Sequence, residues 1–328
     1  MDFLPSEHFL RIPKSLFYKK ESPVCDTFKT ISCKMLPDDF YTSLIDWAGE
    51  SIFFVENNSI VAYNLHTKSQ MQIYSHDKGS VCSMKAIKQS NSLVIGDSIG
   101  NLTFVDFSTL KSITRECHER RISALDVMGD KILTGSGDKT CMIVDSRVKG
   151  RQKMYKNHIL EVCGVSVNRE DRYFCSGGND NIISVVDFRN EALPLVKLEG
   201  HKAAIRALSW SPLHSTKFAS GGGTLDKTIK SWDISLNTPL VQSISFDSQI
   251  CNVKWLNNNK ILSSFGYSDN DIRLLKNLKV EKRYIGHKNR VIHFAVDDRE
   301  EHFVSGSADL DIKIYEIESK FREDIEFR

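Results

Sequence analysis

The sequence contains no long apolar run. None of its stretches approaches the roughly 18 apolar residues of a membrane-spanning helix, and residues 1–15 hold no apolar segment of signal-peptide length. An excess of one charge is also missing, because the formal net charge is +2 with 26% charged residues. Such a balance gives no strong field for nucleic acid or for a membrane surface. We therefore expect a soluble protein of the nucleus and cytoplasm whose partners are proteins, with no nucleic acid and no membrane among them.

Motifs of metal binding and catalysis are scarce as well. The eight cysteines are scattered without any Cys-x-x-Cys spacing, and several lie in apolar strand patterns such as Val162-Cys163-Gly164-Val165. This usage is typical of reduced, mostly buried thiols in an intracellular protein. The sequence has no His-Glu-x-x-His string and no phosphate-binding loop. We predict that the protein is not an enzyme and holds no metal and no cofactor.

Histidines recur at a nearly constant interval along the chain. Each is followed by a run of alternating apolar residues, a turn of small residues and an aspartate. The interval matches the ~40–45 residues of a four-stranded propeller blade. These histidines, separated by 42, 40, 43 and 86 residues, are His76, His118, His158, His201 and His287.

The repeat predicts an all-β fold, a seven-bladed WD-repeat β-propeller. From Asp38 to the C-terminus there are 291 residues, which a repeat of ~42 divides into about seven blades. The first blade, around Ser43 to Asn64, lacks a leading histidine, and the sixth, around Ser248 to Leu275, begins without a Gly-His pair. The aspartates that end the turns should accept hydrogen bonds from turn amides and from the blade histidines, which makes both structural rather than catalytic. They are Asp138, Asp180, Asp226 and Asp309.

The periodic pattern also divides the chain. Residues 1–30 show no sustained period and are expected to form a flexible N-terminal docking arm, residues 31–318 the propeller, and residues 319–328 a C-terminal tail. A propeller must close, because open strand edges would otherwise remain on its first and last blades. The last repeat ends with its third strand at Lys313–Ile317, so the segment Thr30–Met35 is predicted to supply the fourth.

Several strings go beyond a general WD repeat. In their order and their blades they resemble the Fizzy family, the substrate-recruiting coactivators of the anaphase-promoting complex, which is a ubiquitin ligase. The resemblance runs from about Asp38 to Ile317. The strings are Asp38-Asp39-Phe40-Tyr41 with Leu44-Ile45-Asp46-Trp47, Glu161-Val162-Cys163-Gly164, Ser176-Gly177-Gly178-Asn179-Asp180-Asn181, Gly221-Gly222-Gly223-Thr224 with Asp226, and Ser248-Gln249-Ile250-Cys251-Asn252.

The resemblance implies a site for the degron tripeptide Lys-Glu-Asn on one rim of the propeller. Carboxylate and amide oxygens can receive a lysine or an asparagine amide, and an arginine can hold a glutamate by charge-assisted hydrogen bonds. Taken singly, asparagines in turns and charges on a rim also have a structural explanation. The matching positions are Asp46, Asn179, Asn181, Thr224, Gln249 and Arg290.

A second implied site would bind the Arg-x-x-Leu destruction box between the first and last blades. The acidic contact to the arginine of that motif matches Asp39. A further acidic residue of the family falls at Leu310 in this chain, with Asp311 beside it. Asp311 is the expected substitute, although strand alternation would turn it the other way.

The resemblance also implies that both termini dock on the ligase. The nearest match to the N-terminal docking motif is Phe3-Leu4-Pro5, without the arginines of the family, and the C-terminal match is Phe327-Arg328, where the family has Ile-Arg. The expected partners are subunits of the anaphase-promoting complex and degron-bearing substrates such as cyclins. The segment His8–Ile12 resembles one that binds spindle-checkpoint proteins in mitotic members, which adds those proteins to the expected partners.

Two other functions remain open on the residues alone. Blade chemistry is equally compatible with a scaffold propeller that lacks degron specificity, because a fold does not determine a function. Indifference to Lys-Glu-Asn peptides would distinguish that scaffold. A propeller enzyme is the third alternative, and a stoichiometric bound metal would support it.

Overall fold

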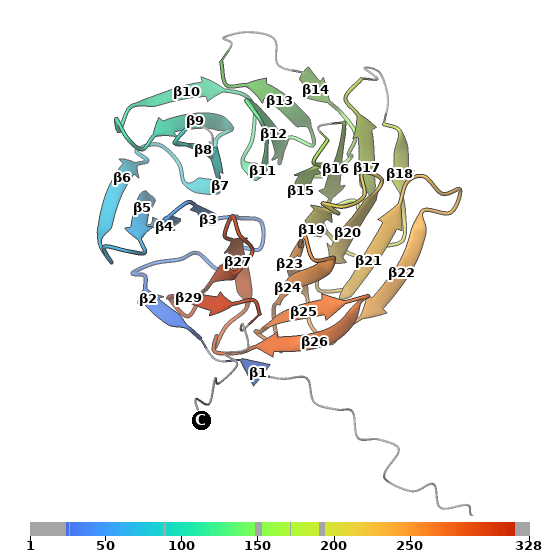
Figure 1. The fold of residues 1–328 in the computed structure, drawn as a ribbon. Helices are drawn as coiled ribbons and strands as arrows, with labels where there is room; N and C mark the ends of the chain where they lie inside the picture. Colours follow the sequence, from blue (N-terminus) through green and yellow to red (C-terminus); the bar gives the residue numbers. More distant parts are fainter. Residues whose placement is uncertain are drawn as a thin grey trace, which may run out of the picture.

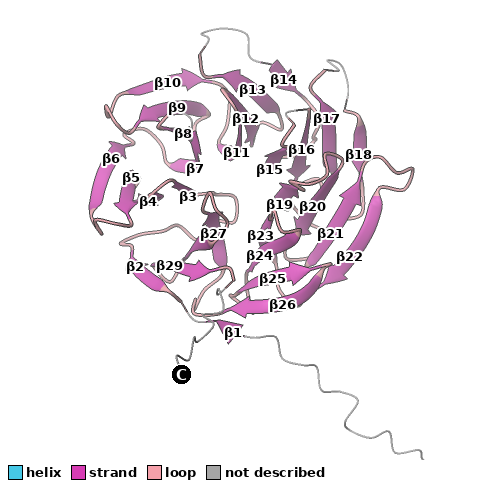
Figure 2. Ribbon diagram, in the orientation of Figure 1, coloured by secondary structure: helices cyan, strands magenta, loops and turns pink. Residues whose placement is uncertain are grey.

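The computed structural model forms a ring of seven twisted sheets around a central axis (Figure 1). Within the described ranges all regular structure is β-strand (Figure 2), and no helix is long and apolar enough to cross a membrane. The sequence prediction of a seven-bladed propeller is confirmed. The structure describes residues 24–25, 27–87, 90–147, 153–170, 172–189 and 194–318.

Each of the first three blades is an antiparallel sheet of four strands that follow one another in the chain. Blade 1 contains β3 (Ile45–Ala48), β4 (Ser51–Glu56), β5 (Ser59–Asn64) and β6 (Gln70–Ser75). Blade 2 contains β7 (Val81–Ile87), β8 (Ser92–Asp97), β9 (Asn101–Asp106) and β10 (Ser112–Glu116). Blade 3 contains β11 (Ile122–Met128), β12 (Lys131–Ser136), β13 (Cys141–Asp145) and β14 (Lys153–Tyr155).

The next blades repeat this order, and the last one is completed from the start of the chain. Blade 4 contains β15 (Val162–Val167), β16 (Tyr173–Gly178), β17 (Ile183–Asp187) and β18 (Val196–Leu198). Blade 5 contains β19 (Ile205–Trp210), β20 (Lys217–Gly222), β21 (Thr228–Asp233) and β22 (Leu240–Ser245). Blade 6 contains β23 (Ile250–Trp255), β24 (Lys260–Phe265), β25 (Ile272–Lys276), β26 (Lys279–Tyr284) and β1 (Val24–Cys25). Blade 7 contains β27 (Val291–Val296), β28 (His302–Ser307), β29 (Asp311–Glu316) and β2 (Lys29–Ser32).

Apolar side chains between neighbouring blades form the core. The second strand of a blade is buried on both faces, as in β16, where all six residues are buried, whereas outer strands such as β22 are largely exposed. Aromatic rings fill the gaps between strands, for example Tyr155 edge-on to Phe174 with 5.0 Å between ring centroids. None of the eight cysteines forms a disulfide, and six of them are buried.

Four of the five repeated histidines hold their blades together by the same network, whereas the Nε2 of the fifth, His76, lies 3.4 Å from the Asp97 carboxylate. In blade 4, His158 Nδ1 lies 3.0 Å from Asp180 and its Nε2 lies 2.9 Å from the Ser176 hydroxyl. The same arrangement links His118 with Asp138 and Thr134, His201 with Asp226 and Ser220, and His287 with Asp309 and Ser305. Because both ring nitrogens are used, the buried imidazole leaves no polar atom unsatisfied.

The N-terminal strand β2 pairs with β29 and completes blade 7. Thr30 lies opposite Lys313 and Ile31 opposite Ile312 in an antiparallel register. The N-terminal segment contributes more than the alternation predicted, because β1 adds a parallel fifth strand to the outer edge of blade 6, where Val24 pairs with Arg283 (Figure 1). Thus residues 24–25, 29 and 30, which the pattern assigned to the flexible arm, pair with the propeller.

Candidate peptide-binding site

A groove of about 340 Å³ opens on one face of the ring, where turns of blades 4, 5 and 6 meet the segment that leads into blade 1. We call this segment, residues 37–43, the crossing loop. The groove is called the amide groove here, because three of its side chains carry amides. Its lining consists of Phe40, Tyr41, Asn179, Asn181, Lys202, Ala203, Ala204, Gly223, Thr224, Leu225 and Gln249.

Two asparagines come from the turn between β16 and β17. Asn179 is held by its backbone, since its N–H donates to the Glu161 carbonyl at 2.8 Å, and its side-chain oxygen accepts from the Tyr41 hydroxyl at 3.0 Å. Burial raises the pKa of Tyr41, which keeps this hydroxyl protonated and able to donate. Asn181 has a left-handed backbone with φ of 63°, a conformation that asparagine tolerates well. Turn geometry therefore accounts for part of its presence and leaves its amide at the groove.

Thr224 and Gln249 complete the polar lining. Thr224 is exposed in the turn between β20 and β21, and Gln249 is buried just ahead of β23. Gly266 lies beside both Gln249 and Arg290, because a Cβ there would be 3.1 Å from Gln249 Oε1 and 3.5 Å from Arg290 Cβ. The structure thus gathers Asn179, Asn181, Thr224 and Gln249 in one groove, with Arg290 at its edge.

Arg290 is engaged by the crossing loop. Its Nε donates to the Asp38 carboxylate, and its terminal NH2 donates to the Asp38 carbonyl oxygen at 2.8 Å. The ring of Tyr267 lies 5.8 Å from the guanidinium carbon. The side chain of Arg290 is 19% exposed, so it is reachable from solvent while its cation is already paired.

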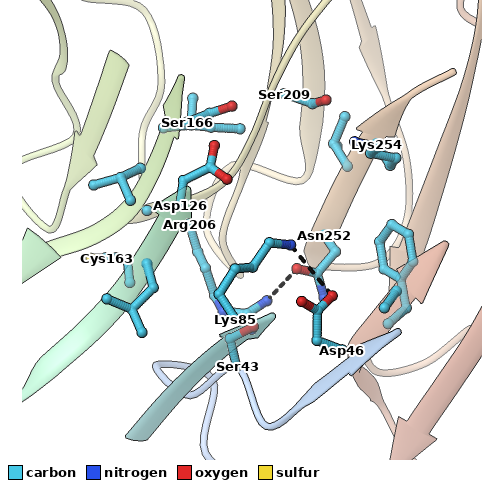
Figure 3. A pocket seen from close by; sticks show the side chains of 18 of the residues that line it. Ser43, Asp46, Lys85, Asp126, Cys163, Ser166, Arg206, Ser209, Asn252 and Lys254 are labelled. Atoms are coloured by element: carbon cyan, nitrogen blue, oxygen red, sulfur yellow. Dashed lines mark hydrogen bonds and ion pairs between the residues drawn. The ribbon is translucent and has the colours of Figure 1, made fainter. Parts of the chain in front are cut away.

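The structure places Asp46 away from the amide groove. Its carboxylate accepts from the Ala86 backbone N–H at 2.8 Å and lies 3.5 Å from Lys85 Nζ, inside the central channel (Figure 3). The Asp46 charge is the main cause that raises the pKa of Lys85. This channel, about 280 Å³ in volume, is lined by residues from the innermost strands of all seven blades, among them Asp46, Lys85, Asp126, Ser166, Ser209 and Lys254.

Arg206 and Phe40 separate the channel from the groove. The buried guanidinium of Arg206 donates to the Cys251 carbonyl at 2.6 Å, to Asn252 Oδ1 at 2.8 Å and to the Thr42 carbonyl (Figure 3 shows the Asn252 contact). It also lies 5.8 Å from the Phe40 ring, which lines the groove. Burial lowers the pKa of Arg206 to about 10, still high enough for a cation at neutral pH. With a further bond to the Ile292 carbonyl at 3.2 Å, the guanidinium joins three chain segments and fixes the crossing loop over the channel.

The two residues assigned to a destruction-box site pair with different cations of the chain. Asp39 accepts from the Tyr41 N–H at 2.9 Å and lies 3.4 Å from Arg121, whose guanidinium forms a bidentate pair with Glu161 at 2.6 and 2.8 Å. Asp311 pairs instead with Lys313 at 3.2 Å, on the same side of β29. The preceding residue, Leu310, is 42% exposed. The docking residues Phe3, Leu4, Pro5, Phe327 and Arg328 lie outside the described residues.

Several residues of the site were not identified from the sequence. Tyr41, Lys202 and Leu225 line the groove, Leu225 being 83% exposed, and Asp38 and Arg121 bind the charged residues of the rim. An apolar residue in a Gly-rich turn was the available signal for Leu225, because turn tips are exposed. The two ion pairs join residues far apart in the chain and left no local signal.

One string of the sequence has the spacing of a catalytic motif, and its surroundings in the structure differ from those of that motif. The string Gly96-Asp97-Ser98-Ile99-Gly100 matches the spacing of a nucleophile elbow, but it connects β8 to β9 rather than a strand to a helix. Asp97 binds the backbone of that turn, through Ile99 N at 3.0 Å and Asn101 N at 2.8 Å. Among all the residues that the structure describes, no group of three or more His, Cys, Asp or Glu side chains could hold a metal ion.

Curated relatives are similar along most of this chain. Protein FIZZY-RELATED 1 of Arabidopsis thaliana is 32% identical over 299 residues, which are 88% of this chain and 62% of that protein. Meiotic fizzy-related protein 1 of Schizosaccharomyces pombe is 30% identical over 89% of this chain and 71% of its own length. APC/C activator protein CDH1 of Saccharomyces cerevisiae is 30% identical over 89% of this chain and 52% of its own length. The chain thus spans about three fifths of the Arabidopsis relative and half of the yeast activator.

The fold and a family description agree with these relatives. A chain of the crystal structure of the mitotic checkpoint complex superposes with a TM-score of 0.84 at 23% identity, covering 89% of this chain and 95% of that one, which shows the shared fold. The family described as the CDC20/Fizzy WD40 domain matches residues 32–315, nearly the whole propeller. The chain therefore belongs to the CDC20/Fizzy WD40-domain family.

Proposed function

We propose that this protein is a substrate-recruiting coactivator of the anaphase-promoting complex, with the amide groove as its site for Lys-Glu-Asn degrons. The observation that carries the proposal is the convergence of Asn179, Asn181, Thr224 and Gln249 on one groove beside Arg290. Family membership and the name of the yeast relative, an APC/C activator, support the ligase as the partner.

The chemistry of the groove suits this tripeptide. Side-chain amide oxygens can accept from a lysine ammonium, and amide groups can exchange paired hydrogen bonds with the asparagine of the motif. The guanidinium of Arg290 offers charge-assisted hydrogen bonds to the glutamate. A site built from amides and one arginine discriminates by hydrogen-bonding pattern, because a mismatched side chain leaves polar groups unpaired.

The role proposed is binding without chemistry. A coactivator raises the effective concentration of substrate lysines near the ubiquitin-charged enzyme. Three residues make few contacts, so we expect micromolar affinity, about −7 to −8 kcal/mol, and tighter capture when a second motif engages. Asp39 remains the proposed acidic contact for a destruction box, which requires that it exchange Arg121 for the arginine of the motif. We propose action in the nucleus and cytoplasm.

The proposal is tested by the binding of a fluorescent Lys-Glu-Asn peptide to the purified chain, measured by anisotropy against a scrambled peptide. We expect sequence-dependent micromolar binding that falls about tenfold or more in Arg290→Ala and in Asn181→Ala, as for loss of a charged or an amide contact. Lys78→Ala, an exposed change ahead of blade 2, serves as the control for surface charge. Equal binding of both peptides by a folded sample would leave a scaffold propeller as the better description.

A further inference from the structure

The arginine of the proposed site already has a carboxylate bound. Asp38 accepts from Arg290 Nε through Oδ1, and its second oxygen lies 3.5 Å from the Tyr267 hydroxyl. The Nε and NH2 donors form the edge of a guanidinium that carboxylates commonly bind side-on. Here that edge faces the side chain and the carbonyl oxygen of one residue, Asp38.

The position of this pair makes it part of the groove's edge. Arg290 immediately precedes β27, Tyr267 lies between β24 and β25, and Asp38 is in the crossing loop. Gly266 brings Arg290 next to Gln249, as the short distances to its virtual Cβ show. The two charged side chains are 19% and 37% exposed, so a ligand can reach the pair from solvent.

The crossing loop does not depend on the Asp38 side chain for its conformation. Asp39 accepts from Tyr41 N at 2.9 Å, and its carbonyl accepts from Thr42 N at 3.1 Å. Thr42 is in turn bound by Arg206. The Asp38 carboxylate can therefore leave Arg290 by side-chain rotation. The hydrogen bond from Arg290 Nη2 to the Asp38 carbonyl oxygen, at 2.8 Å, still orients the guanidinium.

We propose that Asp38 acts as an internal stand-in for the acidic residue of the ligand and thereby sets how strongly the groove selects glutamate. This inference rests on the proposed function. A glutamate that reaches Arg290 replaces one carboxylate by another, so the ion pair gained is offset by the ion pair lost. The apparent affinity equals the intrinsic affinity multiplied by the fraction of molecules in which Arg290 is free. Asp38 is thus a specificity-determining residue, and ligands that present no carboxylate escape this competition.

The test compares Asp38→Asn with the parent chain, using one peptide with Lys-Glu-Asn and one with Lys-Gln-Asn. Loss of the partly exposed competing ion pair should tighten the glutamate peptide about threefold to fivefold and leave the glutamine peptide within twofold. Asp77→Asn is the matched control, because it removes the same charge from an exposed position between β6 and β7. Urea denaturation of all three proteins confirms that they are folded at the assay temperature.

The outcomes separate this inference from the proposed function. Tighter binding of the glutamate peptide alone supports both. If the parent chain binds Lys-Glu-Asn specifically and Asp38→Asn binds it equally or more weakly, Asp38 merely supports the arginine and the inference is overturned while the function stands. Equal tightening in Asp77→Asn would reduce the effect to net charge and also overturn it. If neither the folded parent nor the folded Asp38→Asn variant binds the Lys-Glu-Asn peptide, the proposed function fails and the inference fails with it.

Discussion

Replacing Asp46 with alanine should weaken folding and leave degron affinity unchanged. The Asp46 side chain is 6% exposed and accepts the Ala86 backbone N–H at 2.8 Å, so its removal leaves an amide without its partner inside the channel. An unsatisfied buried amide costs about 1–3 kcal/mol. The ion pair with Lys85 adds little, because the Lys85 side chain is 40% exposed and stays hydrated when alone. We expect a loss of about 2 kcal/mol in the free energy of unfolding.

The assay is urea denaturation followed by intrinsic fluorescence, with peptide binding measured where both proteins are folded. Asp46→Asn is the matched variant, because its side-chain oxygen can still accept from Ala86, and it should lose about 1 kcal/mol or less. An alanine variant of unchanged stability whose peptide affinity falls tenfold would refute this reasoning. In that case Asp46 would contact the ligand from a conformation different from the one described.

The other two predictions concern the stability of the fold. Gly100 has a φ of 98°, and a Cβ there would lie 2.0 Å from the His118 carbonyl oxygen, so Gly100→Ala should lower the free energy of unfolding in urea by about 3 kcal/mol or more. The control Gly129→Ala, where φ is 56° and the surrounding space is open, should lower it by about 1 kcal/mol. Equal losses in the two variants would show that the contact with the His118 backbone does not matter. Burial lowers the pKa of His293 to about 3, and the unfolded side chain titrates near 6.5, so the unfolded state takes up the proton first and this contribution to stability declines as the pH falls below about 6.5. Between pH 6 and 4, the free energy of unfolding of the parent should fall more steeply than that of His293→Gln, with a difference in slope of about 1.4 kcal/mol per pH unit. Parallel pH profiles of the two proteins would contradict the assignment.

The architecture was predictable because the blade signals are local. His158, Ser176 and Asp180 lie within one repeat, so their network leaves a readable interval in the sequence. The closing strand could be inferred by counting strands, and β2 lies within one residue of its predicted start at Thr30. The strand β1 was missed since its two residues show no alternation and its pairing depends on the edge of blade 6.

The site was only partly predictable because it depends on how the crossing loop lies over the ring. Turn residues such as Asn179 and Thr224 reach the groove by blade geometry alone. Asp46 is part of a strand, and its direction into the channel follows from pairing and twist that the resemblance did not specify. The pair of Asp38 with Arg290 spans most of the chain and could be found only in three dimensions.

Closure by an N-terminal strand has a consequence for how the protein is made. Ser32 of β2 pairs with Asp311 of β29. After synthesis of β2, its partner strand β29 is made about 280 residues later, which takes roughly 15–60 s at ordinary rates of translation. Blades 1 to 6 can collapse in order during that time, but the ring becomes continuous only at the end. Truncations at the two ends of the propeller therefore remove the same pairing, and a nascent chain stalled before blade 7 exposes an unpaired edge at β2.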